Sequence, residues 1–191
     1  MAGRLTVITG PMFAGKSTEL LRRVRRAKLA GIKVALLKPS IDTRFGTVRS
    51  HDGLELEAKL IGPNDPIGPV AGDAKLIAID EMQFLADETY VSIIANMVEL
   101  GRDFVLAGLD LDYAGRPFGL MPVLMAYADE VVKLSAICAK CGNDATRTQR
   151  LVNGEPAGLG PVVQIGGAES YEARCLDCWV PPSRVGLGTS E

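Results

Sequence analysis

The sequence contains near its amino terminus the stretch Gly10-Pro11-Met12-Phe13-Ala14-Gly15-Lys16-Ser17, which fits the pattern G-x-x-x-x-G-K-[ST]. A β-rich run over Leu5–Thr9 precedes this stretch, and a helical pattern over Lys16–Ala30 follows it. In such a loop the backbone N–H groups point at an anion, and the dipole of the following helix favours negative charge there. Lys16 can reach the outer phosphates of a nucleotide, and the Ser17 hydroxyl can ligate Mg²⁺. The stretch therefore predicts a strand–loop–helix unit that binds a nucleotide.

The rest of the first two-thirds of the chain alternates short apolar runs with helical patterns. A helix is expected from an N-cap at Asp87 to about Leu100, and Gly31 and Gly101 are expected just beyond the ends of the two helices. Strands that are apolar on both faces are typical of a parallel sheet covered by helices on both sides. We therefore expect an α/β fold with a mostly parallel sheet, whose further strands are Val34–Leu37, Leu76–Ile79, Phe104–Leu109 and Val131–Leu134.

Two carboxylates, Asp80 and Glu81, come directly after the apolar run Leu76–Ile79. We expect this strand to lie beside the first strand, so that Asp80 can hold Mg²⁺ near the phosphate loop. Adjacent side chains of an extended chain point in opposite directions, which leaves Glu81 free to act as a general base or to orient a nucleophile. The alternative is a pair of solvated acids after a strand.

All four cysteines lie in the last third, in the arrangement Cys138-x₂-Cys141 and Cys175-x₂-Cys178. Two such pairs present the four thiolates that Zn²⁺ prefers in a tetrahedral site. Four protein ligands leave no open position, so the predicted zinc site is structural. Two disulfides or a redox pair are the alternatives.

The composition is that of an ordinary globular protein, because 47% of the 191 residues are hydrophobic and 23% are charged. The formal net charge of −2 counts against a general nucleic-acid binder. There is no apolar run of about 20 residues and no signal-peptide pattern, so we expect a cytoplasmic protein without a membrane partner. Near residue 135 the alternation of apolar runs and helical patterns gives way to cysteine pairs and frequent glycines. This change predicts a nucleotide-binding domain over 1–135, a zinc-binding domain over 136–181 and a flexible tail over 182–191.

Weaker signals have plainer explanations. Five basic residues between Arg22 and Lys28 could form a nucleic-acid face, but the favoured interpretation is a solvated or subunit-facing charged surface. His51 is the only histidine and is interpreted as a structural loop residue. A nucleic-acid-dependent ATPase with a zinc ribbon is the alternative function, yet the charges from 138 to 178 are four positive and five negative, which does not favour phosphate binding.

Taken together, these blocks resemble the type II thymidine kinases. The resemblance extends from about Leu5 to Cys178, and it is carried by Gly10–Thr18, Asp42–Arg44, Ser50–Gly53, Asp80–Phe84, Gly108–Asp110, Phe118-Gly119, Ile165–Tyr171 and both cysteine pairs. It implies a RecA-like phosphate-loop domain with a small zinc-ribbon-like domain, assembled as a homotetramer. It also implies phosphate transfer from ATP to the 5′-hydroxyl of thymidine.

The resemblance further implies roles for individual residues. Glu81 matches the family's catalytic base, and Asp80 matches its acid on the Mg²⁺ side. The phosphate-donor site matches Gly10–Ser17, Asp42, Arg44, Asp80, Glu81, Met82 and Gln83. The nucleoside site, including a loop over the thymidine, matches Met12, Phe84, Leu109, Tyr113, Phe118, Val162, Val163, Gln164, Ile165, Gly166 and Tyr171. Met82 and Tyr113 depart from the family's usual alanine and phenylalanine, which bears on fine substrate preference.

Overall fold

The computed structural model describes residues 1–41, 47–49, 53, 55–162, 167 and 170–184. Several predicted residues lie outside the described part of the chain, namely Asp42, Arg44, His51, Val163, Gln164, Ile165, Gly166 and most of the 182–191 tail.

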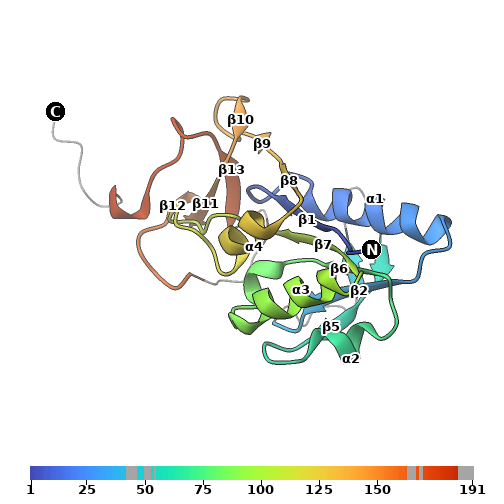
Figure 1. The fold of residues 1–191 in the computed structure, drawn as a ribbon. Coiled ribbons are helices and arrows are strands. Elements are labelled where there is room, and N and C mark those ends of the chain that lie inside the picture. Colours follow the sequence, from blue (N-terminus) through green and yellow to red (C-terminus); the bar gives the residue numbers. More distant parts are fainter. Residues whose placement is uncertain (42–46, 50–52, 54, 163–166, 168–169, 185–191) are drawn as a thin grey trace, which may run out of the picture.

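A six-stranded sheet forms the centre of the first 135 residues (Figure 1). All of its neighbouring strands pair in parallel, which confirms the mostly parallel sheet predicted from the apolar runs. The strand order across the sheet is β5 (Lys59–Ile61), β2 (Val34–Pro39), β6 (Leu76–Ile79), β7 (Asp103–Gly108), β1 (Leu5–Thr9) and β8 (Glu130–Lys133).

Helices cover both faces of this sheet, as the apolar strands require. On one face α1 (Lys16–Leu29) buries Leu20, Leu21 and Val24 against the sheet. On the other face the apolar side chains belong to three shorter helices: α2 (Ile67–Ala71), α3 (Thr89–Glu99) and α4 (Met121–Tyr127). Burial of each large apolar side chain stabilises this arrangement by about 1.5–3 kcal/mol.

The ends of the helices follow local sequence signals. Gly31 has a φ of 75°, which suits the residue after a helix C-cap, and its N–H donates to the carbonyl of Lys28. Helix α3 begins at Thr89 rather than directly after Asp87, and Glu88 is its N-cap residue. The Asp87 carboxylate nevertheless accepts a hydrogen bond from the Thr89 N–H at 2.9 Å, so it still satisfies a first-turn amide.

The expected position of β6 beside β1 is wrong, because β7 lies between these two strands. Neighbouring strands are about 4.8 Å apart, so one intervening strand still leaves the ends of β1 and β6 within the reach of side chains. The carboxyl ends of parallel strands meet at one edge of the sheet. The acids after β6 therefore face the phosphate loop after β1 from two strands away.

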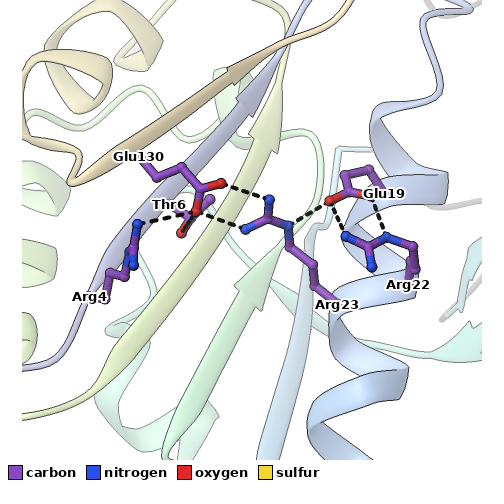
Figure 2. A network of polar contacts seen from close by, with 6 residues as sticks. All are labelled: Arg4, Thr6, Glu19, Arg22, Arg23 and Glu130. Carbon is purple, nitrogen blue, oxygen red and sulfur yellow. Dashed lines mark hydrogen bonds and ion pairs between the residues drawn. The ribbon is translucent and has the colours of Figure 1, made fainter.

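The basic residues of α1 take part in a polar network with the edge of the sheet (Figure 2). Glu19 accepts hydrogen bonds from Arg22 at 2.6 Å and from Arg23 at 2.7 Å. Arg23 also binds Glu130 of β8 through two nitrogens, at 3.0 and 3.1 Å, and Arg4 lies 3.6 Å from the same carboxylate. Two of the five basic residues of this run, Arg22 and Arg23, are therefore paired with acids of the same chain.

The part after residue 135 consists of short antiparallel strands. They form a two-stranded sheet of β9 (Ala136–Ile137) and β10 (Asp144–Ala145), and a three-stranded sheet of β12 (Glu155–Pro156), β11 (Arg147–Val152) and β13 (Tyr171–Arg174). A 3₁₀ turn, η2 (Pro182–Arg184), follows, and a separate hairpin of β3 (Thr47–Arg49) and β4 (Glu55–Glu57) precedes β5. No helix among the described residues is long and apolar enough to span a membrane.

Candidate active site and metal centre

The phosphate loop joins β1 to α1, as its sequence predicts. Gly10 has a φ of 139°, and a β-carbon there would lie 2.3 Å from the carbonyl oxygen of Leu134. Gly15 is the N-cap residue of α1 and adopts a left-handed conformation with a φ of 82°. Glycine meets both requirements without strain, because it has no side chain to collide with the backbone. The loop is thereby held close to the sheet with its amides near the amino end of a 14-residue helix.

Lys16 is the buried cation of this loop. Its Nζ donates to the carbonyl of Pro11 at 2.7 Å, so the side chain curls over the loop that it follows. Burial lowers the pKa of Lys16, and the negative charges of Glu81, Asp80 and Asp110 oppose that effect. Lys16 is therefore within electrostatic reach of three acids that follow strands of the sheet.

Ser17, in the first turn of α1, and Asp80, directly after β6, are brought together although β1 and β6 are not neighbours. The Ser17 hydroxyl donates to the Asp80 carboxylate at 2.9 Å. Burial and the charge of Glu81 raise the pKa of Asp80 to about 7, against the opposing effects of Ser17 and Lys16. A hydroxyl next to a carboxylate, both near the phosphate loop, is the oxygen pair that Mg²⁺ uses in phosphate-loop proteins. These two residues fit a magnesium site.

Glu81 stands at a strained point of the backbone. It has a φ of 54° and precedes the 3₁₀ turn η1 (Met82–Phe84), and its N–H donates to the Asp80 carboxylate at 3.1 Å. A left-handed conformation costs a residue with a side chain about 1–3 kcal/mol, and such strain is concentrated at functional sites. Glu81 is therefore not in the extended backbone from which the sequence predicts opposite directions for the two carboxylates.

The other members of the acidic block have distinct environments. The Gln83 side chain is buried and donates from Nε2 to Glu81, while its Oε1 accepts from the Leu109 N–H at 3.1 Å. The Met82 side chain is fully buried in the apolar core between the sheet and the three shorter helices. Phe84 makes an edge-to-face contact with Phe118, with ring centroids 6.0 Å apart.

Three further residues predicted to line the nucleoside site are Met12, Tyr113 and Tyr171. Met12 lies in the phosphate loop, and its N–H donates to the hydroxyl of Thr148 at 3.0 Å. Tyr113 and Tyr171 are both buried, and the guanidinium of Arg150 lies over the Tyr113 ring at 3.7 Å and over the Tyr171 ring at 5.5 Å. The structure thus brings Tyr113 and Tyr171 to the same guanidinium, that of Arg150 in β11.

Thr148 and Arg150 are residues that sequence reasoning missed. They belong to a run of β11 in which Thr148, Gln149 and Arg150 are all at least 95% buried, although all three are polar. A polar run in a short strand is typical of a solvated edge, and nothing in the sequence shows that the phosphate loop and Tyr113 cover it. The two residues fix the β11 strand against the predicted active site.

The four cysteines form one cluster. Their sulfur atoms all lie within 4.8 Å of one another, and the sulfurs of Cys141 and Cys175 are 3.6 Å apart. Four sulfurs around a Zn²⁺ ion at the usual distance of about 2.3 Å would lie about 3.8 Å apart, so the cluster fits a tetrahedral site. All four are free thiols, which disfavours the two alternative disulfides. Burial opposes ionisation of Cys138, yet backbone N–H groups of residues 175, 141 and 140 outweigh it and lower its pKa to about 6.

The cysteine cluster also touches the phosphate loop. Phe13 and Ala14 pack against the apolar cluster that contains Cys138 and Cys175. Together with the hydrogen bond from Met12 to Thr148, this contact makes the second part of the chain a support for the phosphate loop. A structural metal at the cysteines would therefore stabilise the phosphate loop, which is part of the candidate active site.

Comparisons with known proteins agree with this geometry. The model of the thymidine kinase family matches residues 3–179. A thymidine kinase from Coprothermobacter proteolyticus is 48% identical over 176 residues, which cover 91% of this chain and 88% of that protein. Two solved structures show only a distant likeness: a DNA replication initiation factor, with 14% identity, 69% and 40% coverage of the two chains and a TM-score of 0.45, and AMPPCP-bound DnaA from Aquifex aeolicus, with 15% identity, 71% and 41% coverage and a TM-score of 0.42. The family match spans the phosphate loop, the acids after β6 and both cysteine pairs, and this chain is a member of the thymidine kinase family.

Proposed function

We propose that this protein transfers the γ-phosphate of ATP to the 5′-hydroxyl of thymidine, giving thymidine 5′-monophosphate. The observation that carries the proposal is the placement of Glu81, in a strained turn, at the same sheet edge as the Lys16 phosphate loop. Membership of the thymidine kinase family supports thymidine as the acceptor.

The proposed donor site is the phosphate loop with its acidic partners. The loop amides and Lys16 neutralise negative charge on the phosphates, which is most of what an enzyme contributes to phosphoryl transfer. Ser17 and Asp80 would hold Mg²⁺, which when bound supplies further neutralisation of the transferring group. The rest of the donor site is assigned by resemblance to Asp42, Arg44, Glu81, Met82 and Gln83.

Glu81 is proposed as the general base. A 5′-hydroxyl is a weak nucleophile, and a carboxylate within hydrogen-bond reach can take its proton as attack proceeds. The contact from Gln83 holds the Glu81 carboxylate while leaving its second oxygen available for the hydroxyl. The carboxylate is half-buried, so a substrate can approach it.

The thymidine site is proposed between the two parts of the chain. A flat pyrimidine needs apolar and aromatic walls, and Phe84, Phe118 and Leu109 lie next to the acidic block. Main-chain groups of an extended segment can pair with the edge of the base. The residues assigned to these roles are Met12, Phe84, Leu109, Tyr113, Phe118, Val162, Val163, Gln164, Ile165, Gly166 and Tyr171.

A structural Zn²⁺ is proposed at the four cysteines, since four thiolates leave no open coordination position. We further propose the domain limits 1–135 and 136–181, a flexible tail over 182–191, and a homotetramer, the last from the family resemblance. A reducing, cytoplasmic location suits free thiols that serve as metal ligands.

The proposed function is tested by measuring ADP release from ATP and Mg²⁺ with each deoxynucleoside in turn, and with none. Turnover that depends on thymidine and its close analogues is the expected result. A rate of ADP release that does not depend on nucleosides but rises with single-stranded DNA would contradict the proposal and favour a nucleic-acid-dependent ATPase.

A further inference from the structure

Arg150 is a buried cation in β11, with only 3% of its surface exposed. Its hydrogen-bond partners among the described residues are uncharged: Nε donates to the Tyr171 hydroxyl at 3.2 Å, and the two terminal nitrogens donate to the carbonyls of Pro161 and Val162, at 2.5 and 2.8 Å. A buried charge is costly unless it is both paired with an opposite charge and hydrogen-bonded, so uncharged partners leave this side chain buried at some cost in free energy. Some structural role of Arg150 must therefore offset the cost of burying its charge.

Arg150 binds the segment of residues 157–162, whose far end has few other contacts with the part of the chain that the structure describes. Its residues from Leu159 to Val162 are exposed, so few apolar contacts order them. The Ala157 N–H donates to the main-chain carbonyl of Arg150 at 2.9 Å, which fixes only the near end of the segment. Polar contacts from outside the segment therefore determine its conformation.

Tyr113 supplies the second attachment. Its hydroxyl accepts from the Gly160 N–H at 2.8 Å and donates to the Gly160 carbonyl at 3.0 Å, so it uses both hydrogen-bonding functions on one residue. The Tyr113 ring lies under the Arg150 guanidinium at 3.7 Å, which is a favourable cation–π distance. Three successive residues of the segment, 160 to 162, are thus held by one arginine and one tyrosine.

The guanidinium suits this task better than an ammonium would. Its nitrogens form a rigid planar fork, and here two of them bind the carbonyls of consecutive residues, which fixes the orientation of the peptide between Pro161 and Val162. A lysine could carry the same charge but could not present this fork. The arrangement is specific to arginine.

We propose that Arg150 is a positioning residue for thymidine: its guanidinium, stacked on Tyr113 and bound to Pro161 and Val162, holds the 157–162 segment in the conformation in which Val162 meets the nucleoside. The proposal rests on the proposed function, because Val162 is assigned to the thymidine site there. Arg150 acts through the segment and not on the phosphates. Its loss is therefore expected to weaken the binding of thymidine and to leave the binding of ATP unchanged.

Steady-state kinetics of the 191-residue protein test this role with Arg150→Met and Arg150→Lys. Both substitutions are expected to raise the KM for thymidine by about tenfold or more, as the loss of buried hydrogen bonds to a charged group implies. The KM for ATP and kcat at saturating thymidine are expected to stay within about twofold of the parent. Arg147→Met is the matched control, because Arg147 lies on the same strand and its guanidinium bonds only to the adjacent Thr146 among the described residues, and it leaves all three constants unchanged.

Hydrogen exchange of the substrate-free protein tests the anchoring without reference to activity. The Gly160 amide is expected to exchange about tenfold faster or more in Arg150→Lys than in the parent, while the amides of α1 keep their rates. Arg150→Lys retains the charge and carries the test if Arg150→Met does not fold. An unchanged Gly160 rate, an unchanged KM for thymidine in the folded lysine variant, or parallel losses for ATP and thymidine would each overturn the proposal. A parent protein with no thymidine-dependent turnover would overturn the proposed function instead, and the exchange result would still decide whether Arg150 anchors the segment.

Discussion

Gln83 donates a hydrogen bond from its side-chain amide to the carboxylate of Glu81. The orientation of the amide is determined, because its oxygen accepts from the Leu109 N–H and the nitrogen must then face the acid. Gly108 makes room for this arrangement, since a β-carbon there would lie 2.6 Å from the Gln83 oxygen. The backbone at the end of β7 thus positions Gln83, and Gln83 in turn orients the carboxylate of Glu81, the proposed base.

The role of Glu81 gives the first prediction. Glu81→Gln keeps the size of the side chain but cannot accept a proton, so kcat is expected to fall by about 10²–10⁴-fold. Binding of ATP, measured by calorimetry, is expected to change little, because the phosphates are held by the loop and Lys16. A near-normal kcat in this variant would show that Glu81 is not the base.

Gln83 provides a weaker test of the same arrangement. Gln83→Leu removes both hydrogen bonds and frees the Glu81 carboxylate, so kcat is expected to drop about tenfold, a smaller loss than removal of the base itself. Thermal unfolding of the variant serves as the control for folding. An unchanged kcat in a folded Gln83→Leu protein would mean that Glu81 needs no such support.

The cysteine cluster is expected to hold one Zn²⁺ per chain, measurable by elemental analysis of the purified protein. Cys175→Ser removes one of four ligands and is expected to lose the metal. Turnover is expected to fall with it, because Phe13 and Ala14 of the phosphate loop pack against this cluster. Stoichiometric zinc in the serine variant, or full activity after its loss, would contradict a structural metal centre.

The network around Glu19 makes stability depend on pH in a defined direction. Hydrogen bonds from Arg22, and then from Arg23, lower the pKa of Glu19 from 4.5 to about 2. The ionised acid is favoured in the folded protein, so its contribution is complete above about pH 4.5 and is lost as the pH falls towards 2.

Glu19→Gln is therefore expected to lower the free energy of unfolding by about 1 kcal/mol at neutral pH, a modest value because the pair is partly solvated. Urea titrations of parent and variant should show this difference shrinking below about pH 4. Glu99→Gln, at an exposed helix position, is the control. A difference between parent and Glu19→Gln that is constant with pH would exclude the ion pairs as its source.

Features with a local cause in the chain were predictable. The phosphate loop, the buried strands and the paired cysteines are each determined by neighbouring residues, through glycine geometry, apolar runs and ligand spacing. The structure contains all three at the predicted residues, although not in the expected strand order, and it brings Ser17 and Asp80 into contact.

Features that depend on strand order or on packing across the chain were not predictable. The position of β7 between β1 and β6 depends on how the whole sheet assembles, and apolar strands look alike in sequence. In the sequence, Arg150 is one of several charged residues in a short polar strand. Its burial follows from tertiary contacts with Tyr113 and the 157–162 segment, which the sequence does not show. Tyr113 was assigned to the nucleoside by resemblance, and the structure adds its bonds to Gly160.

The most direct test of the account is to follow the transferred phosphoryl group itself. ATP labelled with ¹⁸O at the γ-phosphate is incubated with the protein, Mg²⁺ and thymidine, and the products are identified by mass spectrometry and ³¹P NMR. We predict that the labelled phosphoryl group is transferred to the 5′-oxygen of thymidine, that 3′-deoxythymidine accepts this group at the same oxygen, and that 5′-deoxythymidine accepts none. Labelled inorganic phosphate in place of this product, or a labelled phosphoryl group on the 3′-oxygen, would contradict the placement of the acceptor hydroxyl beside Glu81.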